Sequence, residues 1–161
     1  MSEFSISHRD FNDGEEIPKK FGYKHGNEIP DHIHWSGVEY DVDCIALIMD
    51  DPDAMAAVGK VWIHWLFYYN AKNGEHPYDL ADFGGDGSGI VNTYGIHGKT
   101  DFGEIGYGGP APPDKRHTYI FKAYALDTKL DLKEGYSKQD LEDAMKSHII
   151  AEAKLTGTFA P

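Results

Sequence analysis

The chain is poor in cysteine, because Cys44 is the only one among its 161 residues. A single cysteine cannot close an internal disulfide, so the fold has no internal disulfide framework. Cys44 lies in the apolar segment of residues 42–49, where a buried thiol usually acts as a small hydrophobic side chain. The sequence also lacks a Gly-x-Ser-x-Gly motif. It therefore does not favour catalysis by a cysteine or serine nucleophile.

No apolar run reaches membrane-spanning length, and the first residues carry neither a basic cluster nor an apolar stretch. We therefore expect a cytoplasmic protein with no stable membrane insertion. Cations are scarce as well, because 15 Lys and Arg residues stand against 27 Asp and Glu residues and leave a net charge of -12. This charge repels a phosphate backbone, so we expect no nucleic-acid partner. A small anion can bind only where local donors overcome the overall field.

Short apolar segments and turn residues are abundant instead. Eighteen glycines and eight prolines separate the apolar runs, which is typical of an all-β sandwich or barrel. Residues 45–49, 62–69 and 118–126 are expected to form central strands that are buried on both faces. We predict a mainly β fold in a single domain over residues 1–161, with a long loop over residues 84–99 at one end of the sheet.

One helix is indicated. Ser137 is a suitable N-cap, with Asp140 three residues further on. Apolar residues then repeat at helical spacing as far as Ile149. We expect this helix to run to about residues 152–153 and to pack its apolar stripe on the sheet.

Two histidines stand near carboxylates, aromatic rings and a segment rich in Gly and Pro. Trp62 and His64 are two residues apart, as are His117 and Tyr119, and side chains two apart on a strand share a face. We therefore expect both pairs to line one small polar cavity, which suits a small anion. Because His117 opens a strand beside a loop, we expect it to have few core contacts. The alternative is that each histidine is an ordinary core or surface residue.

Two acidic residues, Asp51 and Asp53, follow the strand that precedes His64. A carboxylate beside a buried histidine fixes its tautomer and favours its charged form, so we expect one of the two to pair with His64. The alternative is that they only form the Asp-Pro-Asp turn. Within residues 110–113 the amide of Ala111 is the one N–H, and it is directed either at solvent or at a ligand.

A metal pair is suggested by His32 and His34, but no third ligand at suitable spacing is visible nearby. Solvated histidines are the simpler reading. We expect no metal and no cofactor.

Taken in order, these segments resemble the phosphatidylethanolamine-binding protein family, also called the Raf kinase inhibitor protein family, and most closely its short bacterial and archaeal branch. The resemblance covers nearly the whole chain, from about residue 14 to residue 157. It rests on Asp-Pro-Asp-Ala at 51–54, Trp-x-His-Trp at 62–65, Gly-Lys-Thr-Asp-Phe-Gly at 98–103, Tyr-Gly-Gly-Pro-Ala-Pro-Pro at 107–113 and His-x-Tyr at 117–119. Met55 and Thr100 depart from the family pattern, in which Pro and Asn are usual.

The resemblance implies a β-sandwich of antiparallel sheets with a few peripheral helices. It also implies a pocket for small anions such as phosphate or phosphorylated head groups. The residues that it assigns to the two walls of this pocket are Asp51, Asp53, Trp62 and His64 on one side and Ala111, His117 and Tyr119 on the other. Family members are mostly binders or inhibitors of kinases and proteases, and not enzymes.

Three functions are therefore open. The leading hypothesis is a non-enzymatic binding protein for a small anionic or phosphorylated ligand. The second is an inhibitor or scaffold for a protein partner such as a kinase or a protease, with a homodimer left open. The third is a hydrolase that uses the same pocket, either with His64 and Asp51 as a general base or with a metal held by Asp51, Asp53, His64 and His117.

Overall fold

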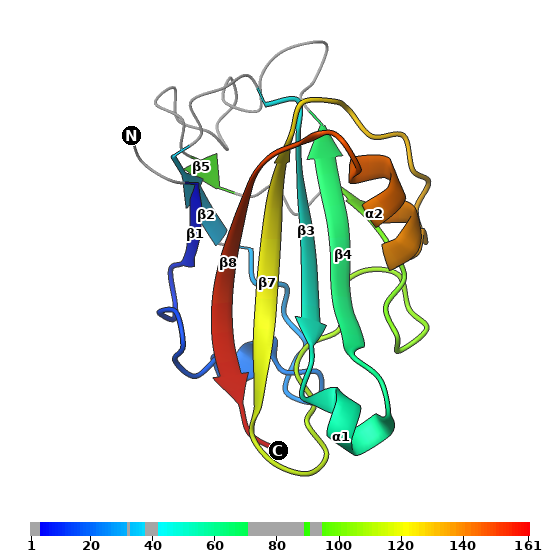
Figure 1. Ribbon diagram of the computed structural model, residues 1–161. Helices are drawn as coiled ribbons and strands as arrows, with labels where there is room; N and C mark the ends of the chain where they lie inside the picture. The colour runs from blue at the N-terminus through cyan, green and yellow to red at the C-terminus, as the bar shows by residue number, and fades with distance from the viewer. Residues whose placement is uncertain (1–3, 32, 38–41, 71–88, 91–94) are drawn as a thin grey trace.

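The computed structural model describes residues 4–31, 33–37, 42–70, 89–90 and 95–161. Within these ranges the chain forms two antiparallel sheets (Figure 1). The larger sheet has the order β6-β4-β3-β7-β8 and consists of Cys44–Asp51 (β3), Trp62–Asn70 (β4), Ile96–His97 (β6), His117–Leu126 (β7) and Ile149–Phe159 (β8). The smaller sheet has the order β1-β2-β5 and consists of Ser5–His8 (β1), Ile33–Ser36 (β2) and Gly89–Ile90 (β5). The helical segments of the same ranges are Lys19–Phe21 (η1, a 3-10 turn), Ala54–Val58 (α1) and Lys138–Met145 (α2).

The centre of the large sheet is β3, which lies between β4 and β7 and is buried along its whole length. On one face Leu47 and Met49 pack in the core layer that includes Trp35 of the small sheet. On the other face Ile48 packs in a second layer with Leu141 of α2, which covers that side of the sheet (Figure 1). Two covered faces require a continuous apolar strand. The prediction of central strands buried on both faces is therefore confirmed for β3 and β4, and the mainly β fold is confirmed as well. Strand β7 is central, but one of its faces, with Ile120 and Lys122, is only half-buried, so the prediction is wrong for that face.

The helix α2 begins as predicted but ends earlier. The Ser137 hydroxyl accepts a hydrogen bond from the Asp140 amide, and the Asp140 carboxylate accepts one from the Ser137 amide. The helix ends at Met145, because Ser147 takes a positive φ of 71° and Ile149 opens strand β8. The predicted extension to residues 152–153 is wrong, because pairing with β7 outweighs the helical spacing of the apolar residues.

Part of the predicted loop over residues 84–99 lies outside the described residues. Of the described part, residues 89–90 pair with β2 as β5, and residues 96–97 pair with β4 as β6. The expectation of an irregular segment is therefore wrong at these two places. Both short strands extend the edge of a sheet.

The residues of interest gather at one end of the large sheet, at the bottom of Figure 1. There β3 ends, β4 begins and β7 begins, because β3 is antiparallel to both of its neighbours. The short helix α1 connects β3 to β4 at this end. The loop that precedes β7 also lies at this end of the sheet (Figure 1).

Candidate ligand-binding site

A β-bulge lies at His64 and sets the face of β4 on which this side chain lies. Met49 lies opposite Trp65 but Asp50 lies opposite Ile63, so His64 is an extra residue on β4. In a regular strand Ile63 and Trp65 would share a face, but Ile63 packs in the layer under α2 and Trp65 packs in the opposite layer. Bulges commonly redirect a side chain next to a functional site in this way.

A cavity of about 130 Å³ lies between α1, the start of β4 and the loop before β7. This volume suits a small ion or head group, since pockets for drug-sized ligands are several times larger. Its walls are Asp51, Ala54, Ala57, Val58, Trp62, His64, Phe102, Ala111, Pro113 and His117. The structure thus brings five of the seven predicted residues to one cavity, namely Asp51, Trp62, His64, Ala111 and His117.

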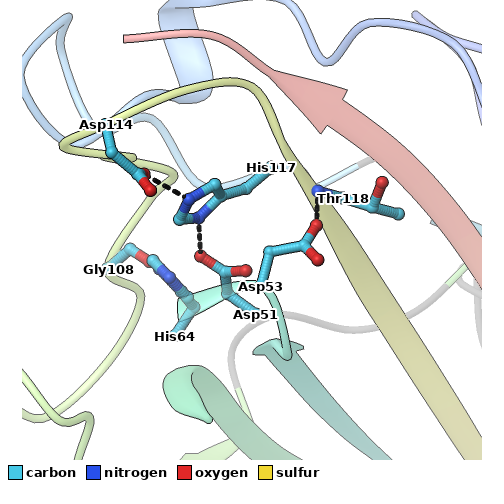
Figure 2. Close-up of polar contacts among 7 residues, drawn as sticks. All are labelled: Asp51, Asp53, His64, Gly108, Asp114, His117 and Thr118. Carbon is cyan, nitrogen blue, oxygen red and sulfur yellow. Dashed lines mark hydrogen bonds and ion pairs between the residues drawn. The ribbon is translucent and has the colours of Figure 1, made fainter. Parts of the chain in front are cut away.

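The other two predicted residues, Asp53 and Tyr119, lie beside the cavity without lining it. Asp53 Oδ2 accepts a hydrogen bond from the Thr118 amide at 2.8 Å and so ties the start of α1 to β7 (Figure 2). The Tyr119 ring is buried, and its hydroxyl lies near the Ala111 amide and the Asp51 carboxylate. Burial raises the pKa of Tyr119, the charge of Asp51 raises it further, and the Ala111 amide opposes both effects.

Two carboxylates hold His117 from both sides, as Figure 2 shows. The Nδ1 atom lies 2.6 Å from Asp51 Oδ2, and the Nε2 atom lies 2.7 Å from Asp114 Oδ1. Each contact needs a proton on the ring nitrogen, because an ionised carboxylate can only accept, and two such contacts favour the imidazolium ion. Burial by itself lowers the pKa of His117, but the hydrogen bonds and charges of Asp51 and Asp114 outweigh it and raise the pKa above 6.5.

Two sequence-based expectations about the histidines are wrong. Asp51 pairs with His117 and not with His64, because β3 and β7 are antiparallel neighbours and the end of β3 lies beside the start of β7. Asp53 does not pair with His64 either, since it binds the Thr118 amide. His117 was expected to have few core contacts, but its side chain is fully buried.

A backbone carbonyl fixes the tautomer of His64. Its Nδ1 atom lies 2.6 Å from the Gly108 oxygen, and a carbonyl can only accept, so Nδ1 carries the proton. Burial lowers the pKa of His64, and the hydrogen bond to Gly108 and the charge of Asp51 oppose this only in part. His64 is therefore a neutral ring whose Nε2 atom is a hydrogen-bond acceptor.

Three site residues were not among those predicted: Phe102, Gly108 and Asp114. The Phe102 ring lies edge-on to Trp62 and His64, with centroid distances of 5.6 and 5.4 Å. It belongs to the Gly-Lys-Thr-Asp-Phe-Gly segment, which was a usable signal. Asp114 stands three residues before His117 in a turn, a weaker signal, and a carbonyl contact such as that of Gly108 has no side-chain signal at all.

The two departures from the family pattern have clear structural settings. Thr100 is buried, and its hydroxyl accepts a hydrogen bond from the Phe102 amide at 3.1 Å, so threonine holds this loop in place. Met55 lies on α1 with 54% of its surface exposed. It adds apolar surface next to the cavity wall.

The described residues offer neither a metal-binding cluster nor a membrane-spanning helix. None of their His, Cys, Asp and Glu side chains form a set of three or more that could hold a metal ion. In the same part of the chain, every helix is too short or too polar to cross a membrane.

Comparison with known proteins agrees with this fold. The phosphatidylethanolamine-binding protein family matches residues 7–160. A UPF0098 protein of Methanothermobacter thermautotrophicus is 39% identical over 152 residues, which are 92% of this chain and 93% of that protein. A UPF0098 protein of Chlamydia trachomatis is 36% identical over 151 residues, again 92% and 93% of the two chains. The chain belongs to the phosphatidylethanolamine-binding protein family.

Solved structures place the fold in the same family. A phosphatidylethanolamine-binding protein homologue of Chlamydia trachomatis superimposes with a TM-score of 0.79 at 32% identity, covering 99% of this chain and 98% of the other. YbcL of E. coli gives a TM-score of 0.75 at 27% identity, covering 98% of each chain. A carboxypeptidase Y inhibitor, solved with its cognate proteinase, has a TM-score of 0.56 at 15% identity, covers 96% of this chain and 81% of the other, and shows the fold alone.

Proposed function

We propose that the protein is a non-enzymatic binding protein that holds a small anion, such as phosphate or a phosphorylated or carboxylated head group, in the cavity at the end of the large sheet. One observation carries this proposal. The buried indole N–H of Trp62, in the wall of the cavity, has no hydrogen-bond partner among the described residues. Folded proteins leave few such atoms unpaired, and a bound ligand would supply the partner.

The chemistry of the walls favours binding over hydrolysis. Among the described residues, none that lines the cavity carries a hydroxyl or thiol side chain that could act as a nucleophile. A histidine that acts as a general base is usually oriented by a carboxylate bound to its other ring nitrogen. In His64 the Gly108 carbonyl occupies that position, and Asp51 is paired with His117 instead. The names of the family and of its relatives are not enzyme names either. The hydrolase alternative therefore has less support.

A protein partner, a kinase or a protease, is a further part of the proposal. The carboxypeptidase Y inhibitor has a related fold and was solved with a proteinase, but at that identity only the fold is comparable. The cytoplasmic location, the homodimer, the absence of a cofactor and the single domain over residues 1–161 stay predictions.

The direct test is a titration of ¹⁵N-labelled protein with inorganic phosphate, followed by NMR. The indole N–H of Trp62 and the amide of Ala111 should shift, because both belong to the cavity. The indole of Trp65 is an internal control, since it already donates to His97 at 3.1 Å. Shifts confined to residues away from the cavity, or chelator-sensitive hydrolysis of a phosphate ester, would contradict the proposal.

A further inference from the structure

The segment of residues 99–103 contributes to two different cavities. Phe102 lines the ligand cavity, whereas its neighbours Asp101 and Gly103 line a separate groove of about 630 Å³. The other walls of this groove, the α2 groove, come from the first turn of α2 and from residues around the start of β4. The ligand cavity measures about 130 Å³, so the α2 groove has room for a much larger occupant, of several side chains.

Cations gather in the α2 groove. Three lysines line it, namely Lys60, Lys99 and Lys138. Among the described residues, the carboxylates of its walls are those of Asp101 and Glu142. Its walls therefore carry one net positive charge, although the whole chain has 15 Lys and Arg residues and a net charge of -12. A local excess of cations on an acidic protein favours a negatively charged occupant at that place.

Two of these lysines contribute little to the stability of the fold. The Lys99 side chain is exposed and makes no ion pair with the described residues. Lys138 opens α2, where the helix dipole disfavours a cation. Its contact with Glu142 is long, at 3.9 Å, and has the less favourable order of the two charges along a helix. Lys60, in contrast, is paired with Asp101 at 2.9 Å. Lys99 and Lys138 are therefore available to the carboxylates of a ligand.

Apolar side chains share the α2 groove with the lysines. Val61 and Ile63 belong to its walls, and Ile105, which is 54% exposed, lies next to Gly135 of the wall. The described residues that line the groove include no aromatic ring and no arginine. A nucleotide would therefore find neither a stacking surface for its base nor a bidentate partner for its phosphates. Lysines beside aliphatic side chains are complementary to a peptide that carries both carboxylates and an aliphatic side chain.

We propose that the α2 groove docks an acidic peptide segment of a partner protein. Lys99 and Lys138 bind carboxylates of the segment, and Val61 and Ile105 contact an aliphatic side chain between them. Because the ion pairs are exposed, the interaction is weak and depends on ionic strength. The inference is independent of the anion proposed for the ligand cavity. It assigns contact with a protein partner to a second surface.

NMR titration of the ¹⁵N-labelled full chain with the capped peptide Glu-Asp-Leu-Asp-Glu tests the inference. The amides of Lys99, Gly103 and Gln139 should shift, because all three residues line the groove. The affinity should fall severalfold between about 50 mM and about 200 mM salt, since salt screens exposed charges. The neutral peptide Gln-Asn-Leu-Asn-Gln has nearly the same shape and should bind at least about tenfold more weakly. Shifts at the Trp62 indole without shifts in the groove would place the peptide in the ligand cavity and overturn the inference.

A matched pair of variants separates the groove from the overall charge. Lys99→Glu reverses one exposed charge of the groove, so the affinity for the acidic peptide should fall at least about threefold. Lys154→Glu changes the net charge equally, but Lys154 lies exposed on β8, at the edge of the large sheet away from β4 and β6. This variant should keep the wild-type affinity.

Three other outcomes would overturn the inference: equal losses in the two variants, equal binding of the neutral peptide, or no shifts in the groove with either peptide. Stronger binding of ATP than of the acidic peptide at the same amides would assign the groove to a small polyanion instead, and so would also overturn it. Phosphate binding in the ligand cavity is measured in a separate titration. Failure of this inference is therefore distinguishable from failure of the proposed function.

Discussion

Asp51→Asn tests the buried ion pair that joins β3 to β7. The side chains of Asp51 and His117 are 4% and 0% exposed, and their polar atoms lie 2.6 Å apart. Removing one charge of a buried pair leaves the other uncompensated, which costs about 3–5 kcal/mol. Asparagine keeps a neutral acceptor for the His117 ring, so we expect a loss at the lower end, about 3 kcal/mol. This corresponds to a fall in Tm of roughly 6–12 °C for a domain of this size.

The loss should depend on pH in a definite direction. The pKa of His117 is raised in the folded state above 6.5, so the charged ring stabilises the fold fully below pH 6.5. This contribution is lost as the pH rises through the raised pKa. In Asp51→Asn one of the two carboxylates that raise the pKa is gone, while burial still lowers it. The difference between wild type and variant should therefore be largest at the acidic end of this range.

Urea unfolding of both proteins at about pH 6 and about pH 9, followed by circular dichroism, measures the effect. Asp114→Asn is the matched control, because Asp114 contacts the other ring nitrogen at 2.7 Å but its side chain is 41% exposed. Water can replace much of what an exposed partner provides, so the free energy of unfolding should fall much less in Asp114→Asn than in Asp51→Asn. The reasoning is refuted if Asp114→Asn costs as much as Asp51→Asn, or if the Asp51→Asn loss is equal at both pH values.

Three further substitutions differ in how far each should affect folding and binding. Ser137→Ala removes the N-cap of α2 and should lower the free energy of unfolding by about 1 kcal/mol, with phosphate affinity unchanged by calorimetry. Gly109→Ala places a Cβ 1.9 Å from the Phe21 carbonyl oxygen. It should cost about 2–3 kcal/mol in thermal unfolding and also weaken phosphate binding, because the loop before β7 must shift. Phe102→Ala removes the ring against His64 and should weaken phosphate binding severalfold, with a stability loss of about 2 kcal/mol for this half-buried side chain.

The central strands could be predicted because their cause is local in the sequence. A strand with both faces covered needs apolar side chains at every position, and β3 has them over residues 45–49. The end of α2 could not be predicted in this way. Ile149 fits a helical repeat, but its pairing with Leu126 of β7 is set by a strand distant in sequence. Local periodicity carries no information about that partner.

The members of the site could be predicted more completely than their partners. Residue types and two-residue spacing indicated Asp51, His64 and His117, and each lines the cavity. Which carboxylate meets which ring depends on the order of strands in the sheet, and β3 has β4 on one side and β7 on the other. Both histidines were therefore possible partners for Asp51. The carbonyl of Gly108 then takes the place on His64 that a carboxylate was expected to fill.

The orientation of His64 depends on a feature that alternation alone cannot supply. Alternation places Trp62 and His64 on one face of β4, as found, but the same rule would also place Leu66 and Tyr68 there. Those two side chains pack in the layer under α2 instead. The bulge at His64 changes the face between the two pairs. The even-numbered positions of β4 thus face the ligand cavity before the bulge and the α2 layer after it, and without the extra residue His64 could not face the cavity while the rest of β4 kept its packing.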